Sequence, residues 1–247
     1  MNPFRLLVCL SLLCLPAFAD AQEVGDSSFS RLNTFSIVGE YSNDSSHIFL
    51  GRAENRKIGD IGVQYQRRLA HRRAFDFSYM AELRPAVVES DPTSDGILVV
   101  TLPKPYTINY GRVPVRKCVQ NSFAAKGFLP DGQPYAQTIN LTCGRRMVVG
   151  QAFSPIGFRL NLEPRHRLQP TFSILGGYMF STEKIPTIAD GSYNFTFEVG
   201  AGFDFFRSHR RSMRLEYAVQ HYSNAGSGVT NTGVDCGFIK LSYAFGR

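Results

Sequence analysis

Strict alternation of apolar and polar residues in eight separate segments is the feature that most constrains how this chain folds. In each segment every second residue is apolar, often Phe, Tyr, Leu or Ile, and the residues between are mostly polar or small. Successive side chains of a β-strand point to opposite faces, so a period of two predicts strands with one apolar face. The predicted strands cover residues 35–41, 60–66, 75–83, 156–162, 172–178, 195–205, 214–220 and 239–245.

The polar face of these strands carries charges of both signs, including Glu82, Arg159 and Lys240. A soluble sandwich would bury its apolar faces against each other, whereas a small membrane barrel turns them toward lipid. Alternation alone does not separate these folds, but the connections do, because they alternate between short and long. Short periplasmic turns and long outer loops are typical of bacterial outer-membrane barrels. The sequence therefore predicts an all-β fold, an eight-stranded antiparallel transmembrane β-barrel.

The N-terminal residues have the features of a secretory signal peptide. Met1–Arg5 is positively charged, Leu6–Leu15 is apolar, and small residues precede a cleavage site that we place after Ala21. Beyond the first twenty residues no run of about 18 apolar residues offers a membrane helix. We therefore expect a signal peptide over residues 1–21, and a single barrel domain over residues 22–247 in the bacterial outer membrane.

The formal net charge is +7, and many of the basic residues fall in short clusters such as Arg165-His166-Arg167 and His209-Arg210-Arg211. A basic chain can bind nucleic acid or an anionic membrane surface. No nucleic-acid motif accompanies these clusters and the protein is predicted to be exported, so we exclude nucleic acid as a partner. We interpret the clusters as solvated turns.

The longest predicted connection, residues 91–146, contains a further apolar run and several prolines. Proline is poorly accommodated in central strands, so we predict an extracellular hairpin or lid here, and a ten-stranded arrangement stays open. Cys118 and Cys143 bracket a polar part of this insertion, and exported proteins can form disulfides, so we expect these two to pair. Cys236 is then either a buried small apolar residue or a reactive thiol beside Asp235.

The segment His221–Gly226, His-Tyr-Ser-Asn-Ala-Gly, places a base and a hydroxyl near the outer end of a predicted strand. His221 and Ser223 share the parity of its apolar residues, which puts them on the lipid-facing side, roughly 7 Å apart. Polar groups on such a face cost free energy and point to function. His221 could take the proton of Ser223, and Asp235 could fix the imidazole tautomer. Candidate oxyanion donors are the Asn231 side chain and a backbone N–H near Gly226, with Asn224 to orient them.

These residues resemble the signature of the lipid A 3-O-deacylase (PagL-type) family of acyloxyacyl hydrolases. Segments Phe153–Phe158 and Asn194–Phe197 are also similar to those of its broader relatives, and the resemblance covers residues 35–245 apart from the insertion. It implies an eight-stranded barrel that hydrolyses the ester-linked 3-hydroxyacyl chain of lipid A in the outer leaflet, with no metal or cofactor. Carried over by position, the resemblance implies that Ser223 is the nucleophile, His221 the base and Asp235 the acid. The family has Glu, which is one methylene longer, at the position of Asp235.

Two other functions stay open. One is a non-catalytic barrel whose long loops serve adhesion or surface structure, and the other is acyl transfer between lipids by the same three residues. The Gly-x-Ser-x-Gly motif is absent, which argues against an α/β-hydrolase site. The His and Cys residues have no metal-ligand spacing. A homodimer also stays open.

Overall fold

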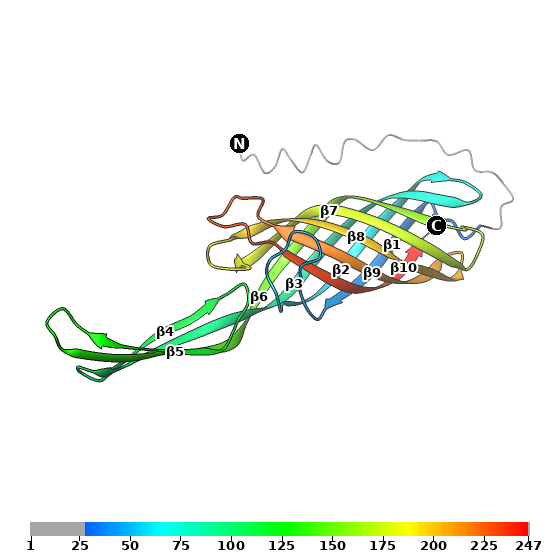
Figure 1. Cartoon of the computed structure of the whole chain (residues 1–247). Helices are drawn as coiled ribbons and strands as arrows, with labels where there is room; N and C mark the ends of the chain where they lie inside the picture. The colour runs from blue at the N-terminus through cyan, green and yellow to red at the C-terminus, as the bar shows by residue number, and fades with distance from the viewer. Residues whose placement is uncertain (1–27, 247) are drawn as a thin grey trace, which may run out of the picture.

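The computed structural model describes residues Ser28–Gly246, and their regular structure is entirely β (Figure 1). The predicted signal peptide, residues 1–21, lies outside the described residues. Within the described part, no helix is long and apolar enough to cross a membrane. The ten strands are β1 (Asn33–Ser42), β2 (Lys57–His71), β3 (Phe75–Leu102), β4 (Tyr106–Pro114), β5 (Asn121–Phe128), β6 (Pro134–Leu162), β7 (Leu168–Ile185), β8 (Gly191–Ser208), β9 (Arg211–Ser223) and β10 (Val234–Gly246).

Eight of these strands form a closed antiparallel ring. The order is β3, β2, β1, β10, β9, β8, β7 and β6, and pairing between β3 and β6 closes it. Each of the eight predicted strands lies within one strand of this ring, so the predicted eight-stranded barrel is confirmed. Closure leaves no unpaired sheet edge in the barrel wall, as a wall in contact with lipid requires.

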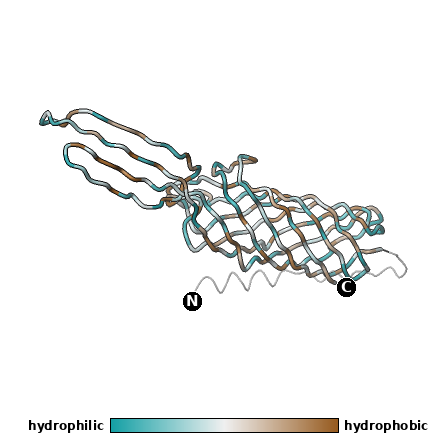
Figure 2. The backbone as a smooth tube through the Cα atoms, turned by 90° about the horizontal axis from the view of Figure 1, so that it is seen from below, coloured by the Kyte–Doolittle hydropathy of each residue, from teal (hydrophilic) through white to brown (hydrophobic). Residues whose placement is uncertain are grey.

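The two faces of the wall differ as the alternation predicts. Along β9, for example, Leu215 and Tyr217 are exposed on the outside, whereas Arg214 and Glu216 are buried inside. The coloured backbone tube shows the same alternation along the barrel strands (Figure 2). The interior is filled with ion pairs, such as Arg159 with Glu216 at 2.9 Å. The fold is therefore inverted relative to a soluble protein, with its apolar residues outward.

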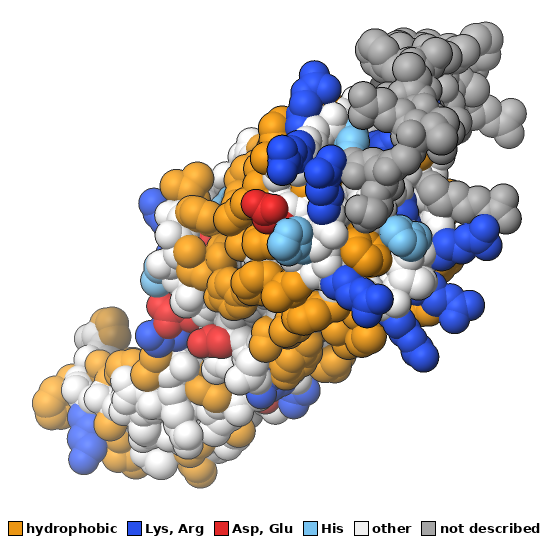
Figure 3. All heavy atoms as spheres, turned by 90° about the vertical axis from the view of Figure 1, so that its right-hand side faces the viewer, with side chains coloured by type: hydrophobic (Ala, Val, Ile, Leu, Met, Phe, Trp, Pro, Cys, Tyr) orange, Lys and Arg blue, Asp and Glu red, His pale blue; other side chains and the backbone are white. Residues whose placement is uncertain are grey.

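The two ends of the barrel differ in their connections. At one end, here called the turn end, short turns link β2 to β3, β6 to β7 and β8 to β9. The basic clusters around Arg72, His166 and Arg210 fall in these turns, as predicted, and Lys and Arg side chains surround this end (Figure 3). The connection of β1 to β2, the insertion, and the connections of β7 to β8 and β9 to β10 lie at the opposite end, here called the loop end.

The insertion differs from the predicted hairpin or lid. Strands β3 and β6 continue beyond the barrel as a paired ribbon, flanked by β4 and β5, and form an arm that projects from the loop end (Figure 1). Regular central strands do run through the insertion, but the prolines on which the contrary expectation rested, Pro103, Pro105 and Pro114, lie in the turn after β3 and at the end of the edge strand β4. Pro92 lies in β3 after its pairing with β2 ends at Ser90 and before its pairing with β4 begins at Thr93, so no ladder pair on that edge requires its missing N–H. Its carbonyl accepts a hydrogen bond from the N–H of Val115 at 3.1 Å.

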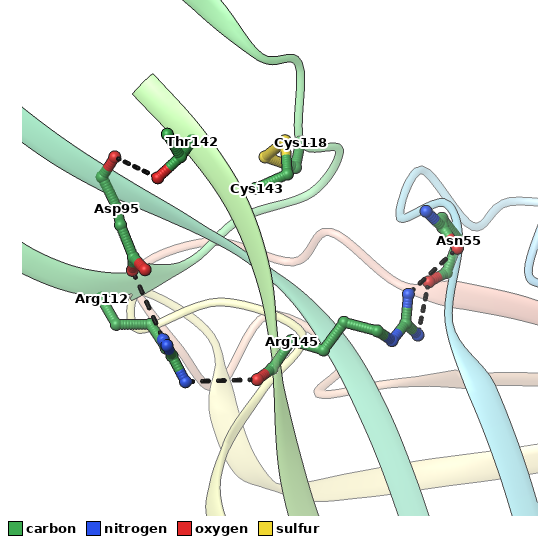
Figure 4. The surroundings of a disulfide bond; sticks show 7 residues. All are labelled: Asn55, Asp95, Arg112, Cys118, Thr142, Cys143 and Arg145. Atoms are coloured by element: carbon green, nitrogen blue, oxygen red, sulfur yellow. Dashed lines mark hydrogen bonds and ion pairs between the residues drawn. A yellow bond between two sulfur atoms is a disulfide. The ribbon is translucent and has the colours of Figure 1, made fainter. Parts of the chain in front are cut away.

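The base of the arm braces the connection between β1 and β2. Cys118 and Cys143 form a disulfide there, and on the same strand Arg145 donates hydrogen bonds to the side chain and carbonyl of Asn55, at 3.1 and 3.0 Å (Figure 4). Lys117 pairs with Glu54 at 2.6 Å. This contact, with a weaker one from His47, lowers the pKa of the Glu54 carboxyl. The arm therefore supports the loop that reaches the candidate site.

Candidate active site

The predicted catalytic pair lies at the loop end of β9, on the outer face of the wall. Ser223 is the last residue of the strand, and His221 precedes it by two positions on the same face. Their partners across β8 are Phe195 and Phe197, which are half-exposed on the lipid-facing side. The pair therefore sits where an apolar wall meets the rim.

Asp235 lies directly opposite His221, as the second residue of β10. The two are partners in the register of β9 and β10, and the Asp235 Oδ1 atom lies 2.6 Å from His221 Nδ1. A carboxylate only accepts hydrogen bonds, so Nδ1 carries the hydrogen and neutral His221 presents an unprotonated Nε2. The shorter Asp side chain thus reaches the imidazole, because strand pairing already brings the two residues together.

The second carboxylate oxygen of Asp235 is held by backbone. Its Oδ2 accepts hydrogen bonds from the N–H groups of Ile48, Phe49 and Gly51, at 3.0, 2.5 and 2.9 Å. These residues belong to residues 45–53, here called the strap, which crosses the outer face of β10 from the end of β1. The Asp235 side chain faces outward by strand parity but is fully buried beneath the strap, whereas the His221 side chain keeps 17% exposure.

Two glycines allow the strap to lie this close. A Cβ atom at Gly51 would come within 2.4 Å of the Asp235 backbone nitrogen, so no larger residue fits there without movement. Gly233 has φ of +62°, and a Cβ at this position would lie 3.0 Å from Cε1 of His221. Backbone pairing of Ala53 with Val234 and of Ser45 with Cys236 fixes both ends of the strap. The acid and the base are thus enclosed by backbone.

The predicted oxyanion residues lie in the connection between β9 and β10. Asn224 is buried, its Nδ2 donates to the carbonyl of Thr230 at 2.7 Å, and its Oδ1 accepts from the N–H of Gly226 at 2.9 Å. Asn224 therefore shapes the loop, and the Gly226 N–H is engaged rather than turned to a ligand. Asn231 is exposed in the same loop. Asp190 anchors this loop from the connection of β7 and β8, through the N–H of Thr232 at 3.0 Å.

Ser223 and His221 lie on one face, but the hydrogen bonds of the described residues do not include one between the Ser223 hydroxyl and the imidazole. Side chains two apart on a strand are roughly 7 Å apart at the backbone. Catalytic hydrogen bonds are often long or poorly aligned before substrate binds.

Sequence reasoning missed the strap as part of the site. Its signal was present: Ile48, Phe49 and Leu50 are three adjacent apolar residues in an otherwise polar connection, followed directly by Gly51. Alternation of apolar and polar residues identifies strands only, so it did not show that Ile48, Phe49 and Leu50 belong to the site. Cys236, which the sequence left open, is a buried free thiol on the inner face of β10, away from the outward-facing pair.

A known family model matches the part of the chain that holds this site. The model of the lipid A 3-O-deacylase (PagL) family matches residues 125–245, which include the whole stretch from His221 to Asp235. No curated protein sequence matches this chain. Among solved structures, it is similar to the outer membrane enzyme PagL, with 12% identity, coverage of 87% of this chain and 99% of that chain, and a TM-score of 0.46.

Two further barrels show similar values. Neisserial surface protein A (NspA) has 8% identity, coverage of 87% of this chain and 97% of that chain, and a TM-score of 0.41. The outer membrane protein OprG from Pseudomonas aeruginosa has 12% identity, coverage of 90% of this chain and 100% of that chain, and a TM-score of 0.41. The chain is a β-barrel of the bacterial outer membrane, and its residues 125–245 match the model of the lipid A 3-O-deacylase (PagL) family.

Proposed function

We propose that this protein hydrolyses the ester that joins a 3-hydroxyacyl chain to position 3 of lipid A. Ser223 is the nucleophile, His221 the general base and Asp235 the acid that orients the base. The observation that carries the proposal is the 2.6 Å contact between His221 Nδ1 and Asp235 Oδ1, on the lipid-facing rim beside Ser223. A structural barrel has no need for a buried carboxylate under an outward-facing imidazole.

The reaction steps follow from the arrangement of Ser223, His221 and Asp235. The Ser223 hydroxyl attacks the ester carbonyl while Nε2 of His221 takes its proton, and the Asp235 carboxylate stabilises the resulting imidazolium. Collapse of the tetrahedral intermediate breaks the bond to the sugar oxygen, which receives the proton from His221. Water then hydrolyses the acyl-serine by the same route, releasing the 3-hydroxy fatty acid and restoring the hydroxyl.

Asn231 is the side chain that we assign to the oxyanion. The Asn224 side chain accepts a hydrogen bond from the N–H of Gly226 and donates one to the carbonyl of Thr230, so it shapes the loop that presents Asn231. An amide N–H donor at the developing negative charge stabilises the transition state more than the ground state. In this assignment Asn224 and Gly226 do not contact the oxyanion but position the loop that carries Asn231.

The location of the site suits a substrate that is itself part of the membrane. The acyl chains of lipid A lie in the outer leaflet, and the pair lies on the lipid-facing wall beside Phe195 and Phe197. A lipid can therefore reach the pair laterally, with its acyl chain along the apolar wall and its ester at the level of the rim. No interior cavity is needed for this reaction.

The test is mass spectrometry of lipid A from cells that produce the wild type or Ser223→Ala at equal outer-membrane abundance. We expect the wild type alone to remove one 3-hydroxyacyl chain. Removal by both proteins would exclude Ser223 as the nucleophile. Removal by neither, in cells whose lipid A carries the 3-O chain, would favour a non-catalytic barrel, and appearance of the chain on another lipid would identify acyl transfer.

Substitution of Gly51 tests the contribution of the strap to this reaction. We expect Gly51→Ala to lower the deacylation rate by about 10²-fold, because the added Cβ would displace the strap from Asp235 and shift the acid. The matched control is Gly39→Ala on β1, where a Cβ meets nothing within 4 Å. Both rates are measured on purified protein in lipid vesicles. Equal rates for the two variants would show that the strap does not position the acid.

A further inference from the structure

The strap carries an exposed apolar tip, formed by Ile48, Phe49 and Leu50. These residues are 42%, 53% and 77% exposed, although the connection around them is polar. The backbone on both sides of Leu50 is fixed, because the N–H groups of Ile48, Phe49 and Gly51 point inward to Asp235. One segment thus binds the catalytic acid on one side and presents three large apolar groups on the other.

The strap bearing the tip binds Asp235 on the outward-facing side of β10. The strap crosses β10 at the level of Asp235, which has the outward parity of Ile239 and Leu241, the exposed residues farther along this strand. The tip therefore continues the band of apolar side chains that faces lipid. Exposed apolar groups next to such a band are stabilised by contact with acyl chains rather than water.

Resting on the proposed function, we propose that the tip is inserted among the acyl chains of the outer leaflet and that this insertion holds the strap on Asp235. The membrane is then part of the positioning of the acid. In the absence of lipid the three side chains gain nothing by facing outward. The strap is freer to leave, and the carboxylate loses the N–H groups of Ile48, Phe49 and Gly51.

The sequence offers a direct probe of the insertion, because the chain contains no Trp. Leu50→Trp, on a protein folded in vesicles, places a single fluorophore at the tip. The matched control is Phe128→Trp, a residue with the same 77% exposure at the end of β5 on the arm. Leu241→Trp on the lipid-facing side of β10 serves as the membrane reference. Lipids brominated along their acyl chains quench a Trp that contacts them.

We expect quenching of the Trp at position 50 to match that at position 241, and the Trp at position 128 to remain unquenched. Quenching at position 50 no greater than at position 128 would overturn the proposal. A blue-shifted but unquenched Trp at position 50 would overturn it as well, because another protein surface would then cover the tip. None of these readings depends on enzymatic activity, so they stand whether or not the protein is a deacylase.

A second experiment tests whether insertion of the tip holds the strap on Asp235. In vesicles, Leu50→Asp is expected to raise hydrogen exchange at the amides of Ile48, Phe49 and Gly51, and to lower kcat by about tenfold or more with little change in KM. Leu50→Phe, which keeps an apolar side chain, is expected to retain wild-type exchange. Unchanged exchange in Leu50→Asp would show that the strap holds the acid without the membrane.

Discussion

Asp235→Asn is expected to lower the rate of lipid A deacylation by about 10⁴-fold while the barrel still folds. The effect is large because the carboxylate is bound from two sides by donors. Nδ1 of His221 lies at Oδ1, and three backbone N–H groups converge on Oδ2. An amide has only one oxygen to offer, so one of the two sides must meet an NH₂ group.

The strap determines whether the NH₂ group of the amide faces the strap or His221. Three converging donors hold the oxygen more strongly than one, so the NH₂ group of the new amide in Asp235→Asn is directed at His221 Nδ1. An NH₂ group requires an acceptor, and Nδ1 can accept only when the imidazole hydrogen moves to Nε2. Nε2 is the nitrogen that must take the Ser223 proton, so the variant holds the base in the unreactive tautomer.

Two measurements check this prediction on protein in lipid vesicles. The deacylation rate follows from mass spectrometry of the lipid, and the nitrogen chemical shifts of His221 report the tautomer. The control is Asp44→Asn, an exposed carboxylate in the same connection as the strap, which should keep the wild-type rate. A rate within tenfold of wild type, with the hydrogen still on Nδ1, would exclude Asp235 as the positioning acid.

The barrel was predictable because its signal is local and repeated. Each strand shows its own alternation, and closure of eight strands satisfies the edges that an open sheet would leave in lipid. The arm was not predictable from the same rules. Pro92 fits into β3 because the pairing with β2 ends before this residue and the pairing with β4 begins after it, and a single sequence does not reveal such register.

The candidate site was predictable in part. His221 and Ser223 were placed on the outer face by parity alone, and the structure puts them there. The strap could not be foreseen, since its contacts with Asp235 are made by backbone N–H groups, which every residue except proline has. For the same reason the sequence did not show that the shorter Asp235 side chain reaches His221. Strand pairing brings it opposite His221, and the strap fills the space behind it.

The interior of the barrel is expected to be most sensitive at Lys240. Its Nζ lies 2.5 Å from Glu198 and 2.6 Å from Glu40, and Glu82 lies at 3.6 Å, all of them buried. Lys240→Met keeps most of the volume but removes the cation between the carboxylates. Breaking a buried ion pair by removing one partner costs about 3–5 kcal/mol. We expect a loss of unfolding free energy of this size.

Urea unfolding of the protein in lipid vesicles, followed by circular dichroism, measures this loss. Lys126→Met on the exposed side of the arm is the control for the substitution itself and should leave the unfolding midpoint unchanged. The double variant Lys240→Met, Glu198→Gln should recover part of the stability, because it removes one of the carboxylates that Lys240→Met leaves without its cation. A change of less than about 0.5 kcal/mol in Lys240→Met, the size of an ordinary surface substitution, would show that Arg84 and the polar interior compensate for the missing charge.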